Sequence, residues 1–96
     1  MNKSLAIVGA TGVVGSVVLK VLEEFNLDFE TIIPVASPKS VGKYVTCFGR
    51  SLQVTDADSA VALKPDFAIF SAGKVVSRKY APLFAEAGTI VIDNSS

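Results

Sequence analysis

Three glycines stand at regular intervals near the start of the sequence, at positions 9, 12 and 15. They follow the apolar run Leu5–Val8 and precede a segment with helical periodicity. Glycine lets a chain turn sharply, lets backbone amides approach a ligand, and lets a helix pack close to a strand. The start of a helix also offers unpaired N–H groups and partial positive charge, which favour a pyrophosphate. The spacing is GxxGxxG rather than GxGxxG, so the phosphate-site interpretation depends on the surrounding elements.

The loop at residues 37–43 (SPKSVGK) is the second candidate site, because it follows a predicted strand at residues 31–36. The end of the second strand is where a Rossmann domain contacts the adenosine ribose of its cofactor. An acidic residue there binds the 2′-hydroxyl of NAD, whereas a cation with small hydroxyl donors accommodates the 2′-phosphate of NADP. Ser37, Lys39 and Ser40 therefore favour NADP. The alternative is a solvated loop with an ordinary lysine.

Two further predicted strands end in small or polar residues. Residues 71–73 (SAG) follow a strand predicted at 66–71, and residues 94–96 (NSS) follow one predicted at 89–93. The small side chains of SAG would leave room for a flat adenine or ribose, although they are also typical of a tight strand-to-helix turn. In a parallel sheet such strand ends meet at one edge, where a ligand crevice forms.

The elements that must position these residues alternate between strand and helix. Helical periodicity predicts a helix from Gly12 or Val13 to Phe25, ended by Asn26 in a left-handed conformation, and another from Ser77 to Ala87. The strands, including one at residues 4–8, are joined through helices and must run parallel with right-handed crossovers. The sequence therefore predicts an α/β fold, a Rossmann-like, doubly wound, mostly parallel sheet with helices on both faces.

Three local features complete the prediction. Residues 44–48 and 51–55 are expected to form a hairpin with Gly49-Arg50 as its two-residue turn. Residues 56–63 are expected to form a short helical turn capped by Asp56 or Asp58. Pro82 falls early in the predicted helix at 77–87, which makes its first turn irregular or moves its start later.

Composition excludes several classes of function. The formal net charge is zero and there is no long basic run, so neither nucleic acid nor an anionic membrane is an expected partner. No histidine is present, and Cys47 is the only cysteine, which leaves no metal cluster and no nucleophile–base pair. A lone cysteine in a β segment is most often a small buried hydrophobe. The apolar run near Lys3 lacks the pattern of a signal peptide, so we expect one cytoplasmic domain.

The segments GATGVVG, ASPKSVG, FSAG, SRKYAP, AEAG and VIDNSS occur in an order and spacing that resembles the N-terminal part of bacterial-type aspartate-semialdehyde dehydrogenases. The resemblance covers essentially the whole chain. DNSS after AGTIVI distinguishes it from the related N-acetyl-glutamyl-phosphate reductases. The resemblance implies that residues 1–96 are an NADP-binding domain, with the catalytic and dimerisation domain absent from this chain.

The resemblance also implies which residues contact the cofactor. The pyrophosphate would be held at the glycine turn by Gly9, Thr11, Gly12, Val13 and Val14, and the 2′-phosphate after the second strand by Ser37, Lys39 and Ser40. The adenosine side would be lined after the third central strand by Ser71, Ala72 and Gly73. The nicotinamide side would be approached by Asn94 and Ser95 at the end of the chain. Family members commonly have arginine in place of Lys39 and glycine in place of Lys74. Lysine keeps the charge of arginine but loses its bidentate geometry, which weakens the expected NADP selectivity.

Family enzymes reduce aspartyl 4-phosphate with NADPH through a cysteine thioester, with a histidine as acid and base, in the biosynthesis of lysine, methionine and threonine. The matching cysteine and histidine would lie beyond Ser96, so the resemblance assigns no catalytic residue to this chain and implies that it is inactive alone. Full-length enzymes form homodimers or homotetramers, and the fragment is expected to be monomeric or to pair through exposed apolar surface. A non-catalytic nucleotide-binding module of the same family is the alternative. Extended short-chain epimerases share GATGxxG but usually carry an acidic residue where Ser37 stands.

Overall fold

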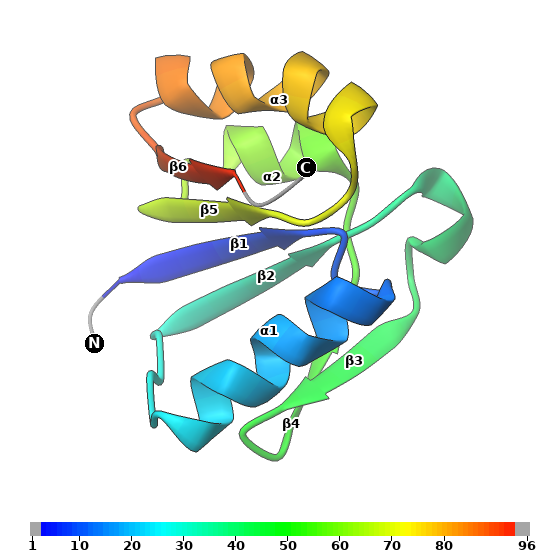
Figure 1. Ribbon diagram of the computed structural model, residues 1–96, viewed down its shortest axis with the longest axis vertical. Coiled ribbons are helices and arrows are strands. Elements are labelled where there is room, and N and C mark those ends of the chain that lie inside the picture. Colours follow the sequence, from blue (N-terminus) through cyan, green and yellow to red (C-terminus); the bar gives the residue numbers. More distant parts are fainter. Residues whose placement is uncertain (1–2, 94–96) are drawn as a thin grey trace.

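A parallel four-stranded sheet in the order β2-β1-β5-β6 forms the centre of the structure, a computed structural model that describes residues 3–93 (Figure 1). The strands of this sheet are β1 (Ser4–Val8), β2 (Thr31–Val35), β5 (Phe67–Phe70) and β6 (Ile90–Asp93). The other elements are α1 (Val13–Glu24), the 3₁₀ turn η1 (Pro38–Ser40), β3 (Tyr44–Cys47), β4 (Arg50–Gln53), α2 (Ala57–Ala62) and α3 (Lys74–Glu86). β3 and β4 pair as a separate antiparallel ribbon.

Alternation along the central strands divides the core into two clusters, one on each face of the sheet. Leu5 and Ile7 of β1 pack with Leu19 and Leu22 of α1. Ala6 and Val8 point to the other face, where α2 and α3 pack. Strands buried on both faces are continuously apolar, which explains the run SLAIV of β1.

The chain winds in opposite directions from the middle of the sheet. The β1–α1–β2 unit extends the sheet to one side, and β5–α3–β6 extends it to the other, with α1 and α3 on opposite faces (Figure 1). The predicted Rossmann-like fold is therefore confirmed. The carboxyl ends of β1 and β5 meet where the direction reverses, which is the point at which open α/β sheets bind ligands.

The predicted hairpin exists, but its turn was placed one residue too late. The turn consists of Phe48 and Gly49, and Arg50 is the first residue of β4. Both turn residues have positive φ, 54° for Phe48 and 72° for Gly49, as a type I′ turn requires. The strand position of Arg50 brings its guanidinium to within 2.7 Å of the Asp28 carboxylate.

The prediction that the second long helix begins at Ser77 was wrong. The helix α3 begins at Lys74, and Gly73 with φ of 97° is its N-cap. Ser77 is instead a buried residue of α3, and its hydroxyl donates a hydrogen bond to the Asp93 carboxylate at the end of β6. Pro82 consequently lies in the helix interior, on an exposed side where water can hydrate the carbonyl left without a helix donor.

Three smaller predictions are confirmed. Asn26, directly after the end of α1, has φ of 54° in the left-handed region. Asp56 rather than Asp58 caps α2, because its carboxylate accepts a hydrogen bond from the backbone N–H of Ser59 at 2.7 Å. Cys47 is fully buried between α1 and the β3–β4 ribbon.

Within residues 3–93, no helix has the length and apolar character needed to span a membrane.

Candidate functional site

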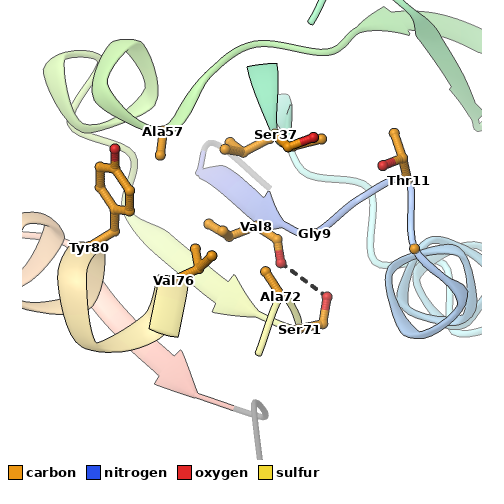
Figure 2. Close-up of a pocket in the computed structure, with 12 residues that line it drawn as sticks. Val8, Gly9, Thr11, Ser37, Ala57, Ser71, Ala72, Val76 and Tyr80 are labelled. Atoms are coloured by element: carbon orange, nitrogen blue, oxygen red, sulfur yellow. Dashed lines mark hydrogen bonds between the residues drawn. The ribbon is translucent and has the colours of Figure 1, made fainter. Parts of the chain in front are cut away.

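A pocket of about 410 Å³ lies at the carboxyl end of the sheet, at the point where its winding reverses (Figure 2). It joins the ends of β1, β2 and β5 to one side of α2 and α3. Its lining comprises Val8, Gly9, Thr11, Gly12, Val35, Ala36, Ser37, Ala57, Ser71, Ala72, Val76 and Tyr80. The predicted residues Gly9, Thr11, Gly12, Ser37, Ser71 and Ala72 are thus brought together from three separate parts of the chain.

Gly9 and Gly15 are glycines because the fold leaves no room for a side chain. Gly9 has φ of 95°, and a Cβ atom there would lie 3.0 Å from the backbone of Ser71 and Ala72. A Cβ atom on Gly15 would lie 2.1 Å from the carbonyl oxygen of Gly9, far inside van der Waals contact. The first glycine therefore permits the turn, and the third lets α1 pack directly against it.

Gly12 differs from its two neighbours because the fold does not require glycine at this position. Its φ of −82° suits any residue, and a Cβ atom would lie 3.5 Å from the Gly9 carbonyl oxygen, an ordinary contact. Gly12 is the N-cap of α1, with no side-chain cap and no acidic residue in the first turn. The first-turn N–H groups of a helix have no intrahelical partner, so this end of α1 can donate to an anion.

Backbone hydrogen bonds fix the three strand ends relative to one another. The N–H groups of Gly9 and Ala10 both donate to the Val35 carbonyl oxygen, at 2.8 and 3.0 Å. The backbone N–H and the side-chain hydroxyl of Ser71 both donate to the Val8 carbonyl oxygen, at 2.9 and 3.0 Å (Figure 2). Ser71 therefore has a structural role, while its hydroxyl oxygen keeps its capacity to accept a bond from a ligand.

The predicted 2′-phosphate residues divide between the pocket and its margin. Ser37 lines the pocket, whereas Lys39 and Ser40 belong to the turn η1 that follows it and do not line it. The turn is held by a hydrogen bond from the Ser40 N–H to the Ser37 carbonyl, at 2.9 Å. Lys39 is exposed, so its long side chain is free to adopt several rotamers next to the pocket.

The remaining predicted residues lie outside the pocket lining. Val13 and Val14 form the exposed first turn of α1, and Gly73 caps α3 beyond the pocket residues Ser71 and Ala72. Asn94 and Ser95 lie outside the described residues. The structure therefore brings only part of the predicted pyrophosphate set and part of the predicted adenosine set together in one pocket.

Sequence reasoning missed the wall opposite the glycine turn. Ala57, Val76 and Tyr80 form one end of the pocket, and Thr11 lies at the other (Figure 2). The Tyr80 hydroxyl donates a hydrogen bond to the Asp58 carboxylate at 3.2 Å, which fixes the ring between α2 and α3. The i, i+4 spacing of Val76 and Tyr80 marks one face of a helix, but only the packing of α2 beside α3 directs that face into the pocket.

Cys47 is chemically unsuited to act as a nucleophile in this structure. Burial, reinforced by the Glu23 carboxylate, raises the pKa of the Cys47 thiol, which disfavours the reactive thiolate. Its closest polar partner is the Leu19 carbonyl oxygen, 3.7 Å from the sulfur. Within residues 3–93 no group of three or more metal-ligating side chains occurs. Cys47 does not line the pocket at the carboxyl end of the sheet.

The family model described as Semialdehyde dehydrogenase, NAD binding domain matches residues 4–96. The chain belongs to this family. The resemblance to aspartate-semialdehyde dehydrogenases, found from the order of the sequence motifs, is thereby confirmed.

Individual members of the semialdehyde dehydrogenase family support the assignment. The aspartate-semialdehyde dehydrogenase of Legionella pneumophila is 48% identical over 93 residues, which are 97% of this chain and 27% of that protein. Aspartate semialdehyde dehydrogenase II of Vibrio cholerae, solved with ASA, superposes with a TM-score of 0.93 at 38% identity, over 100% of this chain and 31% of that one. The Candida albicans enzyme, solved with NADP, has the same fold, with a TM-score of 0.80 at 23% identity over 100% and 30% of the two chains. The chain thus spans less than a third of the length of these relatives.

Proposed function

We propose that this chain binds NADP(H) in the pocket at the carboxyl end of the sheet, as the cofactor domain of an aspartate-semialdehyde dehydrogenase. The observation that carries the proposal is Gly12, a helix N-cap on the pocket where the fold tolerates a side chain but the sequence has none. A glycine that folding does not need is accounted for by a ligand that approaches the backbone closely. The NADP bound by the Candida albicans relative, which has the same fold, supports this choice of ligand.

Different residues around the pocket would contact different parts of the cofactor. The N-terminus of α1, at Thr11, Gly12, Val13 and Val14, would donate N–H groups to the pyrophosphate. The apolar wall opposite, which includes Val76 and Tyr80, would accept a flat base, with Ser71, Ala72 and Gly73 along the adenosine. Asn94 and Ser95, which follow β6, would approach the nicotinamide.

The choice of NADP over NAD rests on the end of β2. Ser37 stands on the pocket where NAD-preferring domains usually carry an acidic residue that binds the ribose hydroxyls. No carboxylate of the pocket lining would repel a 2′-phosphate, because the lining contains no Asp or Glu. Lys39 and Ser40, directly after Ser37, would supply a charge and a hydroxyl to that phosphate.

In the whole protein, this domain would serve the reductive dephosphorylation of aspartyl 4-phosphate. NADPH supplies the hydride for that reaction when it is bound. The residues of this chain would bind and orient the cofactor, while the nucleophile and the acid/base would come from elsewhere in the polypeptide. The sequence contains no histidine, and its only cysteine is buried with a raised pKa, so we propose that the chain alone has no dehydrogenase activity.

Calorimetry of the purified chain with NADP and NAD tests the assignment. We expect NADP to bind more tightly than NAD, and Lys39→Ala to weaken NADP binding roughly tenfold, about the strength of a hydrogen bond to a charged group. NAD binding should not change in this variant. The matched control is Lys20→Ala, which removes an exposed lysine of α1 that does not line the pocket.

Equal affinity for the two cofactors would contradict the role of Ser37 and Lys39. Absence of binding to either cofactor would contradict the function itself. An effect of Lys20→Ala equal to that of Lys39→Ala would show a general effect of charge rather than a contact with the 2′-phosphate.

A further inference from the structure

A second pocket, of about 440 Å³, lies beside the glycine turn. One wall is the side of α1 that carries Ser16, Lys20 and Glu23, and the other wall is β3 with the residue that precedes it (Figure 1). Of the residues that line it, only Thr11 also lines the pocket at the carboxyl end of the sheet. We call it the α1–β3 pocket. Its volume lies in the range of small-molecule sites, about 300–1,000 Å³.

Two lysines stand on the two walls of the α1–β3 pocket. Lys20 shares one side of α1 with Ser16 and Glu23, because these residues have i, i+4, i+7 spacing. Lys43 precedes β3 and comes two residues before Val45, whose side chain packs against the core cluster beneath α1. Side chains two apart along an extended segment lie on the same side, so Lys43 is on the side that faces α1. The two ammonium groups therefore border the same space from different elements.

The two lysines have no partner of opposite charge within residues 3–93. No hydrogen bond or ion pair joins the ammonium group of Lys20 or Lys43 to another described residue. Lys20 is three residues before Glu23, a spacing that permits an ion pair on a helix. The Glu23 carboxylate instead accepts a hydrogen bond from the backbone N–H of Phe48 at 3.1 Å. Phe48 follows the end of β3 that is remote from Lys43, so the one negative charge of the lining is held at that end.

The floor of the α1–β3 pocket is apolar. Ala10 and Leu19 are buried in the core, and Val45 packs against the same cluster. The backbone N–H of Ala10 donates to the Val35 carbonyl oxygen at 3.0 Å, which ties this floor to β2. A ligand in the pocket would therefore contact an ordered apolar surface beneath the charged groups.

The backbone around Lys43 is fixed as well. Its N–H donates to the Ser40 carbonyl oxygen at 3.1 Å, and its carbonyl oxygen accepts from the Val54 N–H at 2.8 Å. The side-chain hydroxyl of Thr11 has no hydrogen bond to another described residue, so it can donate to a ligand. A phosphate group suits these donors, because it accepts hydrogen bonds through three oxygens and carries a charge of about −1.5 to −2 at pH 7.

We propose that the α1–β3 pocket binds a small phosphate monoester, with the phosphate between Lys20 and Lys43 and the organic part on the apolar floor. Hydrogen bonds from ammonium groups to phosphate are charge-assisted and about twice as strong as neutral ones. A dianion also balances both lysines, which a single carboxylate does not. Apart from Thr11, the site lies outside the lining of the pocket to which we assign NADP, so the proposal does not rest on cofactor binding.

Titration of the ¹⁵N-labelled chain with phenyl phosphate, followed by NMR, tests the proposal. The titration is done at low ionic strength, because salt screens exposed charges. We expect saturable shifts of the amide signals of Lys20, Lys43 and Val45, also when NADP is present. The amides of Val76 and Tyr80 report separately on any binding in the other pocket. Inorganic phosphate should bind roughly threefold more weakly, because it leaves the apolar floor uncovered, and phenol should give no saturable shift.

Substitution of the two lysines tests the location of the phosphate without disturbing the core. Lys20→Gln and Lys43→Gln remove the charge of exposed side chains on two different elements. Each should weaken phenyl phosphate binding about fivefold, with unchanged circular dichroism of the free chain. The matched control is Lys64→Gln, which alters an exposed lysine after α2 that lines neither pocket and should retain the parent affinity.

Four results would overturn the proposal. The first is the absence of saturable shifts at Lys20, Lys43 and Val45. The second is a loss of affinity in Lys64→Gln equal to that in Lys20→Gln and Lys43→Gln, because this would show a general effect of charge. The third is equal binding of phenol and phenyl phosphate, and the fourth is displacement of phenyl phosphate by NADP, which would assign the two lysines to the cofactor.

Discussion

Substitution of Gly12 by alanine separates the two reasons for which a glycine can be needed in a phosphate-binding turn. With φ of −82°, alanine is allowed at this position, and its Cβ would lie 3.5 Å from the nearest atom, the Gly9 carbonyl oxygen. Alanine is a poorer N-cap than glycine by about 0.5–1 kcal/mol. It also restricts the unfolded chain, which is stabilising by about 0.4–1 kcal/mol. The two effects nearly cancel, so the free energy of unfolding should change by less than about 1 kcal/mol.

The same methyl group should be costly to a bound cofactor. An extra methyl in a close contact costs about 1–3 kcal/mol, which corresponds to a loss of affinity of roughly 5-fold to 150-fold. Calorimetry with NADP measures the loss, and thermal unfolding followed by circular dichroism measures stability. A change of 1 kcal/mol in a domain of this size shifts Tm by about 4–8 °C, so Gly12→Ala should remain within that range.

Gly15→Ala is the contrasting variant in the same turn. Its Cβ would lie 2.1 Å from the Gly9 carbonyl oxygen, a backbone atom, so we expect the native circular dichroism signal to be lost. The reasoning is refuted if Gly12→Ala binds NADP within twofold of the parent chain. It is equally refuted if Gly12→Ala lowers Tm by much more than 8 °C, because the fold would then require this glycine.

Other predictions follow from the pocket wall, one hydrogen-bonded carboxylate and the buried thiol. Tyr80→Ala should weaken NADP binding several-fold by removing the wall, whereas Tyr80→Phe, which loses only the hydroxyl, should bind almost normally; calorimetry of both variants decides whether the ring or the hydroxyl matters. The backbone N–H of Ser4 donates a hydrogen bond to the Asp66 carboxylate at 2.8 Å and lowers the pKa of that carboxyl group. This hydrogen bond therefore stabilises the fold fully above about pH 4, and the stabilisation is lost as the pH falls through the lowered pKa of Asp66. Urea unfolding between pH 2 and 7 should therefore show a weaker acid dependence in Asp66→Asn, and an identical pH profile would contradict the assignment. The Cys47 thiol, buried with a raised pKa, should react with a disulfide reagent only after unfolding, and rapid labelling of the native chain at pH 8 would contradict its burial.

The order of elements and the position of a pocket at the strand ends could be predicted because they depend on local chemistry. Continuous apolar runs located the central strands, and a period-3.6 hydrophobic pattern located α1, each to within a residue or two. Asn26 was predicted as a left-handed cap from its position after α1, and its φ of 54° agrees. The errors concern alternatives that lie within a few residues of one another. Gly49 could have occupied either position of the hairpin turn, and either Gly73 or Ser77 could have capped α3.

Tertiary packing decided between those alternatives. Arg50 lies in β4, where its side chain pairs with Asp28 from the loop after α1. Ser77 lies on the buried side of α3, where its hydroxyl donates a hydrogen bond to Asp93 of β6, a residue that is distant in sequence. Such contacts join segments that a local pattern treats independently, so the pattern alone could not rank the alternatives.

The sequence by itself determined that glycines, hydroxyls and small residues would follow the strands, and that a parallel sheet would collect them at one edge. It did not distinguish the roles of Gly9, Gly12 and Gly15, which have the same side chain. Only the folded chain places backbone atoms within 3.0 Å of a Cβ at Gly9 and 2.1 Å of one at Gly15, while it leaves space at Gly12. The physical reason is that the space around a backbone atom depends on every segment packed against it, whereas a sequence motif describes the residues of one segment only.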